Sequence, residues 1–233
     1  MVALGDSLTQ AYNSPPCVNT NCPQNSWSTG TAPSVNSHYQ RIQAVNPGMT
    51  VADNRAQTGV AMAGLLGQVN AAVASPTDYE YVTIEMGGED VCIGNAPGDV
   101  LTDPTAFQTQ FDTAMTALFN GLPQTRVFVS SIADLTRLYD SLSGNPAAVD
   151  SWAARGTCRN ILGNASTSTT TSRAAARTAT IAYNQALRAV CAAHAPRCIY
   201  DDDWLFNETG PTDEISTVDY LHLTVAGQEH LAQ

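Results

Sequence analysis

Lysine is absent from this 233-residue sequence, in which ten arginines supply all the strongly basic side chains. A phosphate-binding loop of the GxxxxGK(S/T) type, a Schiff-base lysine and a Ser–Lys dyad all need lysine, so the sequence excludes them. Histidine is scarce as well, and the four residues are His38, His194, His222 and His230. They form neither an HExxH motif nor a pair at helical ligand spacing, so we expect no metal and no cofactor.

Positive charge is also in short supply. Ten basic residues face 21 acidic ones, which gives a net charge of −11. With no basic stripe to neutralise phosphates, the sequence argues against a nucleic-acid partner and against docking on anionic lipid. No apolar run is long enough to cross a bilayer, so we expect no stable membrane insertion. The acidity is typical of a protein kept in solution by its charge.

The sequence has six cysteines but no CxxC motif, which weakens zinc-ribbon and thioredoxin interpretations. An even count with two close pairs indicates disulfides and an oxidising compartment. Among the possible connectivities we favour the local pairs Cys17–Cys22 and Cys191–Cys198, which leaves Cys92 with Cys158. No signal peptide is visible before the first strand, so we expect a leader to have been removed from a secreted protein.

Five short apolar runs alternate with helix-like stretches along the chain. The predicted strands are residues 2–4, 49–54, 79–86, 126–132 and 198–203. The predicted helices are residues 37–45, 60–73, 103–122, 147–163 and 173–195, with a last helix from about residue 224 and a surface loop at 164–172. This alternation predicts a three-layer α/β/α sandwich around a five-stranded parallel sheet, as in flavodoxin-like folds. Because no linker divides the chain, we expect a single domain over residues 1–233.

Two short motifs stand at opposite ends of the chain. "GDSLT" places Ser7 directly after the first strand, where Gly5 permits a tight turn and a following helix would point N–H groups at the serine oxygen. "DYLH" places Asp219 three residues before His222, so that the carboxylate can hold one imidazole nitrogen while the other faces a nucleophile. Alone, each motif is more often a helix cap or a turn. Together, in this order, they favour a nucleophile and its base, at the edge where parallel sheets carry their sites.

With these motifs the sequence resembles the GDSL, or SGNH, hydrolase family over nearly its whole length. The family blocks are GDS at the first strand, a glycine after the second, GxND after the third and DxxH near the end. Here they read "GDSLT", "NRAQTG", "GGED" and "DYLH". The three cysteine pairs make the chain resemble the secreted actinobacterial-type esterases and lipases of that family.

The resemblance implies roles for the matching residues. Ser7 would form an acyl-enzyme, His222 would act as its base, and Asp219 would orient His222, although some members use a backbone carbonyl for that purpose. The oxyanion hole would take the N–H groups of Ser7 and Gly59 and a side chain from the third block. Asp6 would brace the turn after the first strand. Gly87 and Asp90 match the family pattern in the third block and would have a supporting structural role.

The third block departs from the family pattern, because Glu89 stands where the family has asparagine. An asparagine amide donates a hydrogen bond to the oxyanion, whereas an ionised glutamate only accepts. Three interpretations remain open. Glu89 is protonated and donates as a carboxylic acid, it swings out of the site, or the position was changed in a way that cripples or retunes the enzyme.

We therefore expect a monomeric, serine-dependent carboxylic-ester hydrolase for a small-molecule or lipid ester, with lipid, aryl and acetylated-sugar esters all open. The rival interpretation is a silent domain of the same family that binds an ester or glycan, for which Glu89 is the best support. A third, disfavoured by the acidity, is a flavodoxin-like binding module. Trp27 and Trp152 belong either to a substrate groove or to the core, and the acidic run 201–203 is expected to be a solvated strand end.

Overall fold

The computed structural model describes residues 1–93 and 100–233. Its five strands are β1 (Val2–Gly5), β2 (Asp53–Asn54), β3 (Tyr81–Glu85), β4 (Arg126–Val129) and β5 (Cys198–Tyr200). They form one parallel sheet in the order β2-β1-β3-β4-β5. The predicted five-stranded parallel sheet is confirmed. Strand β1 extends one residue beyond its predicted run, to Gly5, and the other four strands are shorter than predicted. The loop expected after the third strand includes residues 94–99, which lie outside the described part.

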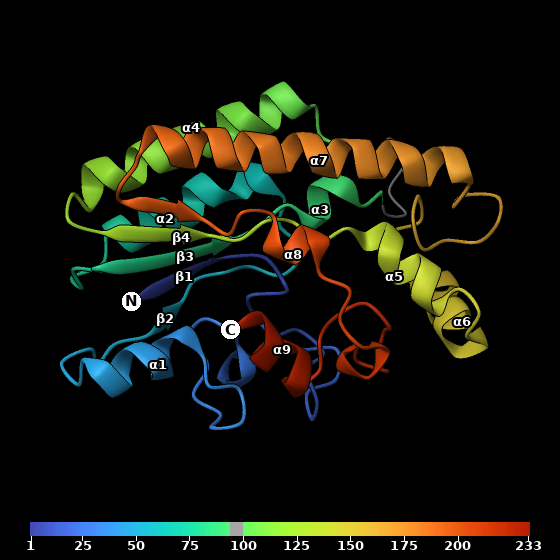
Figure 1. The fold of residues 1–233 in the computed structure, drawn as a ribbon, viewed down its shortest axis with the longest axis horizontal. Helices are drawn as coiled ribbons and strands as arrows, with labels where there is room; N and C mark the ends of the chain where they lie inside the picture. Colours follow the sequence, from blue (N-terminus) through green and yellow to red (C-terminus); the bar gives the residue numbers. More distant parts are fainter. Residues whose placement is uncertain (94–99) are drawn as a thin grey trace.

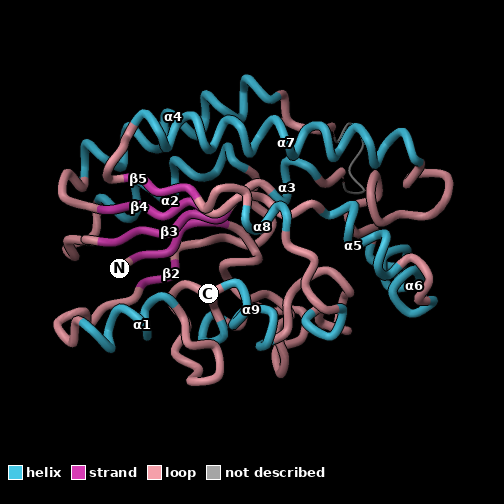
Figure 2. Tube along the Cα trace, viewed as in Figure 1, coloured by secondary structure: helices cyan, strands magenta, loops and turns pink. Residues whose placement is uncertain are grey.

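Helices cover both faces of the sheet, as predicted. One face carries α2 (Leu65–Val73), α4 (Pro104–Gly121) and α7 (Thr170–Ala193), and the other carries α1 (His38–Val45) and α9 (Val225–Leu231) (Figure 1). Figure 2 shows the strands between these two helical layers in the same view. Two more helices, α5 (Leu135–Leu142) and α6 (Pro146–Arg155), lie beyond the carboxyl ends of the strands. The short elements are α3 (Gly88–Val91), α8 (Trp204–Asn207) and the 3-10 turns η1 (Pro23–Asn25), η2 (Met62–Gly64) and η3 (Thr212–Glu214).

Helix α4 illustrates how the sequence builds the core. Asp103 caps the helix by accepting hydrogen bonds from the N–H groups of Thr105 and Ala106, and Pro104 occupies the first turn. The buried residues of α4 recur at helical spacing and include Phe107 and Phe111. The Phe107 ring stacks on Tyr183 of α7 with 4.4 Å between centroids, so the two helices share one apolar interface above the sheet.

Several segments differ from the predictions in their boundaries or type. The helix predicted over 147–163 ends at Arg155, because Gly156 adopts a left-handed conformation (φ 67°) that stops it. The predicted loop 164–172 is shorter, since Thr169 caps α7 and the helix begins at Thr170. After β1 the chain makes consecutive turns over residues 7–13 instead of a regular helix.

Two predictions about individual residues are settled by burial and contacts. Trp27 and Trp152 are both buried, so they belong to the core and not to a groove. The run 201–203 lies after the end of β5 instead of within it. Asp201 accepts hydrogen bonds from the N–H (2.9 Å) and Oγ (2.7 Å) of Ser131, so this carboxylate ties the ends of β4 and β5 together.

The three predicted disulfides are present, as Cys17–Cys22, Cys92–Cys158 and Cys191–Cys198. Within residues 1–93 and 100–233, no helix combines the length and the hydropathy that a bilayer crossing requires. The same described residues contain no group of three or more histidine, cysteine, aspartate and glutamate side chains arranged to hold a metal ion.

Candidate active site

Ser7 lies at the carboxyl end of β1, on a turn that Gly5 makes possible. Gly5 has a φ of 149°, and a Cβ at this position would lie 2.2 Å from the carbonyl oxygen of Glu85 on β3. Only glycine allows β1 to approach β3 so closely here. The turn is braced from within, because Asp6 Oδ1 accepts a hydrogen bond from the N–H of Leu8 at 2.9 Å. Through this hydrogen bond Asp6 braces the turn that carries Ser7.

The structure brings Ser7, His222 and Asp219 together in one line. His222 Nε2 lies 2.8 Å from Ser7 Oγ, and His222 Nδ1 lies 2.6 Å from Asp219 Oδ2. The Tyr12 ring packs edge-to-face with the imidazole, with 5.1 Å between centroids. A hydroxyl, an imidazole and a carboxylate in this order can pass a proton from the hydroxyl to the imidazole while the carboxylate stabilises the resulting cation.

The loop that carries Asp219 and His222 is fixed by its own hydrogen bonds. Asp219 Oδ1 accepts from the N–H groups of Leu221 (3.0 Å) and His222 (3.1 Å) around a left-handed Tyr220, whose φ is 56°. Burial alone would raise the pKa of Asp219, but hydrogen bonds from His222 and Asn13 and the nearby imidazole lower it to about 2. The carboxylate beside His222 is therefore ionised across the range in which proteins function.

The third block forms the short helix α3. Gly87 has a φ of 132°, and a Cβ there would lie 2.3 Å from Ile132 Cδ1, which explains the glycine. Asp90 is buried and accepts from the N–H of Met62 and from Thr102 Oγ1, both at 2.8 Å, so it joins α3 to two neighbouring segments. The Cys92–Cys158 disulfide anchors the end of α3. The backbone around position 89 is thus held from both sides.

Glu89 is exposed and lines the same cleft as Ser7 and His222. Partial desolvation and the negative charge of Asp6 raise the pKa of Glu89, while His222 opposes the shift. Burial also raises the pKa of Asp6, and burial together with Asp6 raises the pKa of Glu85 well above its usual range. The carboxyl groups on this side of Ser7 therefore hold protons more tightly than free side chains do.

Gly59 lies in the loop after β2. This loop runs beside the serine turn, since the N–H of Gln57 donates to the carbonyl of Gly5 at 3.0 Å and Gln10 Nε2 donates to the carbonyl of Ala56 at 2.6 Å. Gly59 is exposed, with a φ of 78°, and is not among the described residues that line the cleft. Its predicted contribution of an N–H group stays a prediction.

A cleft of about 220 Å³ opens beside Ser7 and His222. Its walls are mainly apolar and come from α5, α8 and the segment before α9, through residues that include Leu135, Leu138, Leu205, Ile215 and Leu223. Trp204 on α8 also lines the cleft and is 39% exposed. Neither α5 nor this tryptophan was predicted from the sequence. The position of Trp204 directly after the fifth strand was the available signal, because cleft residues follow the carboxyl ends of parallel strands.

Comparisons with known proteins agree with this fold. The psychrotrophic esterase EstA from a Pseudoalteromonas species superposes with a TM-score of 0.57 at 13% identity, covering 99% of this chain and 91% of that one. Phospholipase A1 from Streptomyces albidoflavus superposes with a TM-score of 0.51 at 17% identity, covering 97% and 93%. An extracellular lipase from Streptomyces rimosus gives 0.50 at 19% identity, with the same coverage. These likenesses concern the fold.

A search of curated proteins finds no match. The sequence model of the GDSL-like lipase/acylhydrolase family matches residues 1–233, the full length of the chain. This protein therefore belongs to the GDSL-like lipase/acylhydrolase family.

Proposed function

We propose that this protein is a carboxylic-ester hydrolase that works through an acyl-enzyme on Ser7. The observation that carries the proposal is the position of the His222 ring, with Nε2 2.8 Å from Ser7 Oγ and Nδ1 2.6 Å from Asp219. The family membership supports ester hydrolysis in general. The assignment of these three side chains as the reacting and orienting groups is our inference from their geometry.

In this mechanism Ser7 Oγ attacks the ester carbonyl carbon while its proton moves to His222 Nε2. The tetrahedral intermediate collapses, the bond to the alcohol breaks, and His222 returns the proton to the leaving alkoxide. Water then attacks the acyl-enzyme, again giving its proton to His222, which returns it to Ser7 Oγ as the acid leaves. Asp219 keeps the Nδ1 proton in place and stabilises the imidazolium in both halves of the reaction.

The oxyanion of each intermediate would be bound by the N–H groups of Ser7 and Gly59 and by Glu89 as a neutral carboxylic acid. The raised pKa of Glu89, caused by desolvation and by Asp6, supports the protonated form. A neutral carboxyl can donate the hydrogen bond that an asparagine donates in the family pattern. An ionised Glu89 would repel the oxyanion, so activity should depend on this proton.

The apolar walls of the cleft support an acyl chain as its occupant, with the ester carbonyl at Ser7. We further propose that the chain works as a monomeric single domain over residues 1–233. Its three disulfides support an extracellular site of action.

A second candidate is a silent domain of the same family that binds an ester or glycan without hydrolysing it. The observation that favours it is Glu89 itself, which carries a carboxyl group where the reaction needs a donor. Binding would need the cleft but neither a polarised Ser7 nor a proton on Glu89.

Hydrolysis of p-nitrophenyl esters from acetate to laurate, by the parent protein and by Ser7→Ala, separates the two candidates. The esterase proposal predicts turnover by the parent that rises with chain length until the cleft is filled, and none above background by Ser7→Ala. The silent-domain proposal predicts that both proteins are inert while ester analogues still bind. Equal turnover by both proteins would overturn the assignment of Ser7.

A further inference from the structure

Asn13 lies directly behind the Asp219–His222 pair, in a segment that none of the family blocks includes. Its side chain is buried, and its Nδ2 donates to Asp219 Oδ2 at 2.5 Å. The same carboxylate oxygen receives the hydrogen bond from His222 Nδ1. Asp219 Oδ2 is therefore held between two donors, one from the loop of His222 and one from a residue 206 positions away along the chain.

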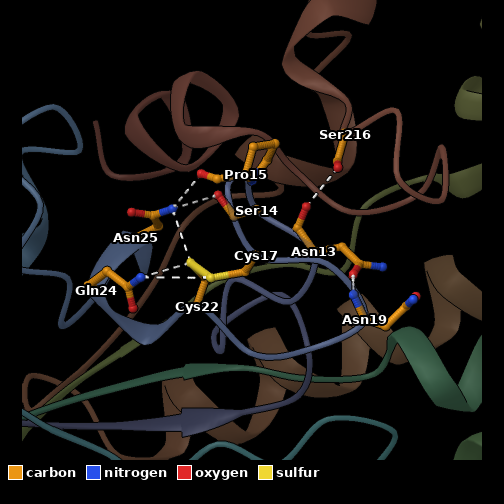
Figure 3. Close-up of a disulfide and its surroundings, with 9 residues drawn as sticks. All are labelled: Asn13, Ser14, Pro15, Cys17, Asn19, Cys22, Gln24, Asn25 and Ser216. Carbon is orange, nitrogen blue, oxygen red and sulfur yellow. Dashed lines mark hydrogen bonds between the residues drawn. A yellow bond between two sulfur atoms is a disulfide. The ribbon is translucent and has the colours of Figure 1, made fainter.

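The amide of Asn13 is held in the orientation that presents its N–H to Asp219. Asn13 Oδ1 accepts from the backbone N–H of Asn19 at 2.5 Å, and the backbone N–H of Asn13 donates to the carbonyl of Thr20 at 3.1 Å. Ser216 Oγ donates to the Asn13 carbonyl at 2.7 Å (Figure 3). A flipped amide would place an oxygen against Asp219 and an NH2 group against the N–H of Asn19, so it would lose two hydrogen bonds.

The residues that orient Asn13 belong to a small covalent loop. Asn19 and Thr20 both lie between Cys17 and Cys22, whose disulfide closes the loop beside Asn13 (Figure 3). The N–H groups of Cys17 and Cys22 donate to the carbonyls of Ser14 and Gln10, both at 3.0 Å, and this fixes the loop to the turns that follow Ser7. The cysteine loop, here meaning residues 17–22, is thus attached to the serine segment at both ends.

Helix α6 joins the cysteine loop to the loop of Asp219. Arg155 donates to Asn19 Oδ1 at 2.8 Å and to the carbonyl of Val218 at 2.9 Å. Trp152 Nε1 donates to the carbonyl of Tyr220 at 3.0 Å. The two segments that meet at the Asn13–Asp219 hydrogen bond are therefore held by the same helix.

We propose that Asn13 is a positioning residue for the Asp219–His222 pair, and that the disulfide-closed loop 17–22 sets the orientation of its amide. The proposal rests on the esterase function proposed above. Asn13 is not among the described residues that line the cleft, so it acts through Asp219 and not on the substrate. This separates its effect on turnover from any effect on binding.

Removing the Asn13 amide has two expected consequences. Asp219 loses one restraint on its orientation, which lowers kcat but leaves KM unchanged. Asp219 Oδ2 also becomes a stronger acceptor for His222, which stabilises the imidazolium and moves the acid limb of the pH–rate profile to higher pH. Asp6 and Glu89 also interact electrostatically with His222, and both remain in place. A merely structural role would not move that limb.

The first experiment measures kcat, KM and the pH profile of Asn13→Gly and Asn13→Asp with an aryl ester. Glycine accepts the left-handed backbone of Asn13, whose φ is 56°, and aspartate keeps the side-chain shape but replaces the donor with an acceptor. We expect kcat to fall about tenfold for Asn13→Gly and about a hundredfold for Asn13→Asp, with KM within about twofold. The matched control is Gln24→Ala, which removes an exposed side chain that contacts the same disulfide but not Asn13, and it should behave as the parent does.

The second experiment compares two short disulfides. The double variant C17S/C22S should lower kcat several-fold and shift the acid limb in the same direction as Asn13→Gly. The double variant C191S/C198S opens a loop of similar length, with a sequence separation of 7 instead of 5, between α7 and the start of β5. It should leave both quantities unchanged. Equal effects of the two double variants would overturn the role of the cysteine loop.

The outcomes separate this proposal from the proposed function. If Ser7→Ala is inactive but Asn13→Gly keeps the parent's kcat and acid limb, the role of Asn13 is wrong and the esterase function stands. If Ser7→Ala keeps the parent's activity, the esterase proposal fails. The proton NMR signal of His222 Nδ1–H then still decides about Asn13, because it reports the hydrogen bond to Asp219 and needs no turnover. A changed chemical shift of this proton in Asn13→Gly supports the positioning role, and an unchanged shift overturns it.

Discussion

Carboxyl groups flank Ser7 on two sides, and the two sides differ in how many hydrogen-bond donors surround these groups. On the side of His222, Asp219 accepts hydrogen bonds from His222 Nδ1, from the Asn13 amide and from two backbone N–H groups. On the side of α3, Asp6, Glu85 and Glu89 are brought together with fewer donors, and Glu85 Oε2 has no partner among the described residues.

The difference appears as opposite shifts of pKa. Burial would raise the pKa of Asp219, but its donors lower it to about 2, so it stays ionised beside the imidazole that must carry positive charge. Burial raises the pKa of Asp6 and Glu85, and partial desolvation with the charge of Asp6 raises the pKa of Glu89, so these groups favour protons beside the place where negative charge develops in ester hydrolysis. The same functional group, a carboxyl, thus stays ionised on one side of Ser7 and favours its proton on the other, and its surroundings decide which.

The largest expected effect comes from the side of Asp219. Asp219→Asn should lower kcat by about 10⁴-fold, because an amide facing Nδ1 favours the wrong tautomer of His222. Steady-state kinetics with an aryl ester measure the loss of kcat, and circular dichroism checks that the variant folds. The control is Asp213→Asn, an exposed carboxylate on η3. A loss below tenfold would mean that Asp219 does not orient His222 and that the donors around it serve only the loop.

The second effect comes from position 89. Glu89→Asn should raise kcat by about 10²–10³-fold at alkaline pH, because the amide donates at every pH whereas Glu89 donates only while protonated. The proton is bound below the raised pKa of Glu89 and lost as the pH rises through it. We therefore expect the parent's activity to decline on the alkaline side and the variant's activity not to. Glu89→Gln, with a longer amide, should fall between them, and a parent faster than Glu89→Asn at all pH values would contradict the donor role.

The smallest effect concerns stability and comes from Glu85. Burial and Asp6 raise its pKa in the folded chain, so the folded state holds this proton more tightly than the unfolded state does. This stabilisation is fully present below the pKa of Glu85 in the unfolded chain. It is lost as the pH rises through the pKa of Glu85 in the folded chain. As the pH rises from the unfolded pKa through the raised folded pKa, the free energy of unfolding should fall in the parent and stay flatter in Glu85→Gln. Denaturant unfolding at several pH values measures this dependence of the free energy of unfolding on pH. The control is Asp112→Asn on the exposed face of α4. Identical slopes in parent and Glu85→Gln would contradict the comparison.

The sheet could be predicted because its signals are local, and Ser7 and His222 could be predicted because each lies in a short motif of the family pattern. The strands are apolar runs of the right length, and parallel strands place the residues that follow them at one edge, where Ser7 and the third block meet. The cysteine pairs followed from their spacing. The short strand β2 shows the limit of this logic, since only Asp53 and Asn54 pair with β1 out of a predicted run of six residues. Edge pairing depends on tertiary contacts that an apolar run does not encode.

What could not be predicted depends on distant contacts. Asn13 lies in "AYNSPPC", a stretch with no motif, and gains its partner only when the two ends of the chain meet. Arg155 and Trp152 reach the loop of Asp219 from the last turns of α6, which ends at Arg155, an end that the helical pattern did not reveal. The raised pKa of Glu89 likewise depends on desolvation in the folded chain and on Asp6 being close. Spacing along the chain carries none of this information.

Covalent labelling tests the central claim most directly. A p-nitrophenyl alkylphosphonate would lose p-nitrophenolate as Ser7 Oγ attacks phosphorus, and it would leave a phosphonyl group on the serine. We predict one adduct per chain by intact mass, located on the peptide of Ser7 by fragmentation, and strongly slowed in the Asp219→Asn variant. No adduct at Ser7 in a protein that still hydrolyses aryl esters, or labelling that is unchanged in Ser7→Ala, would contradict the account.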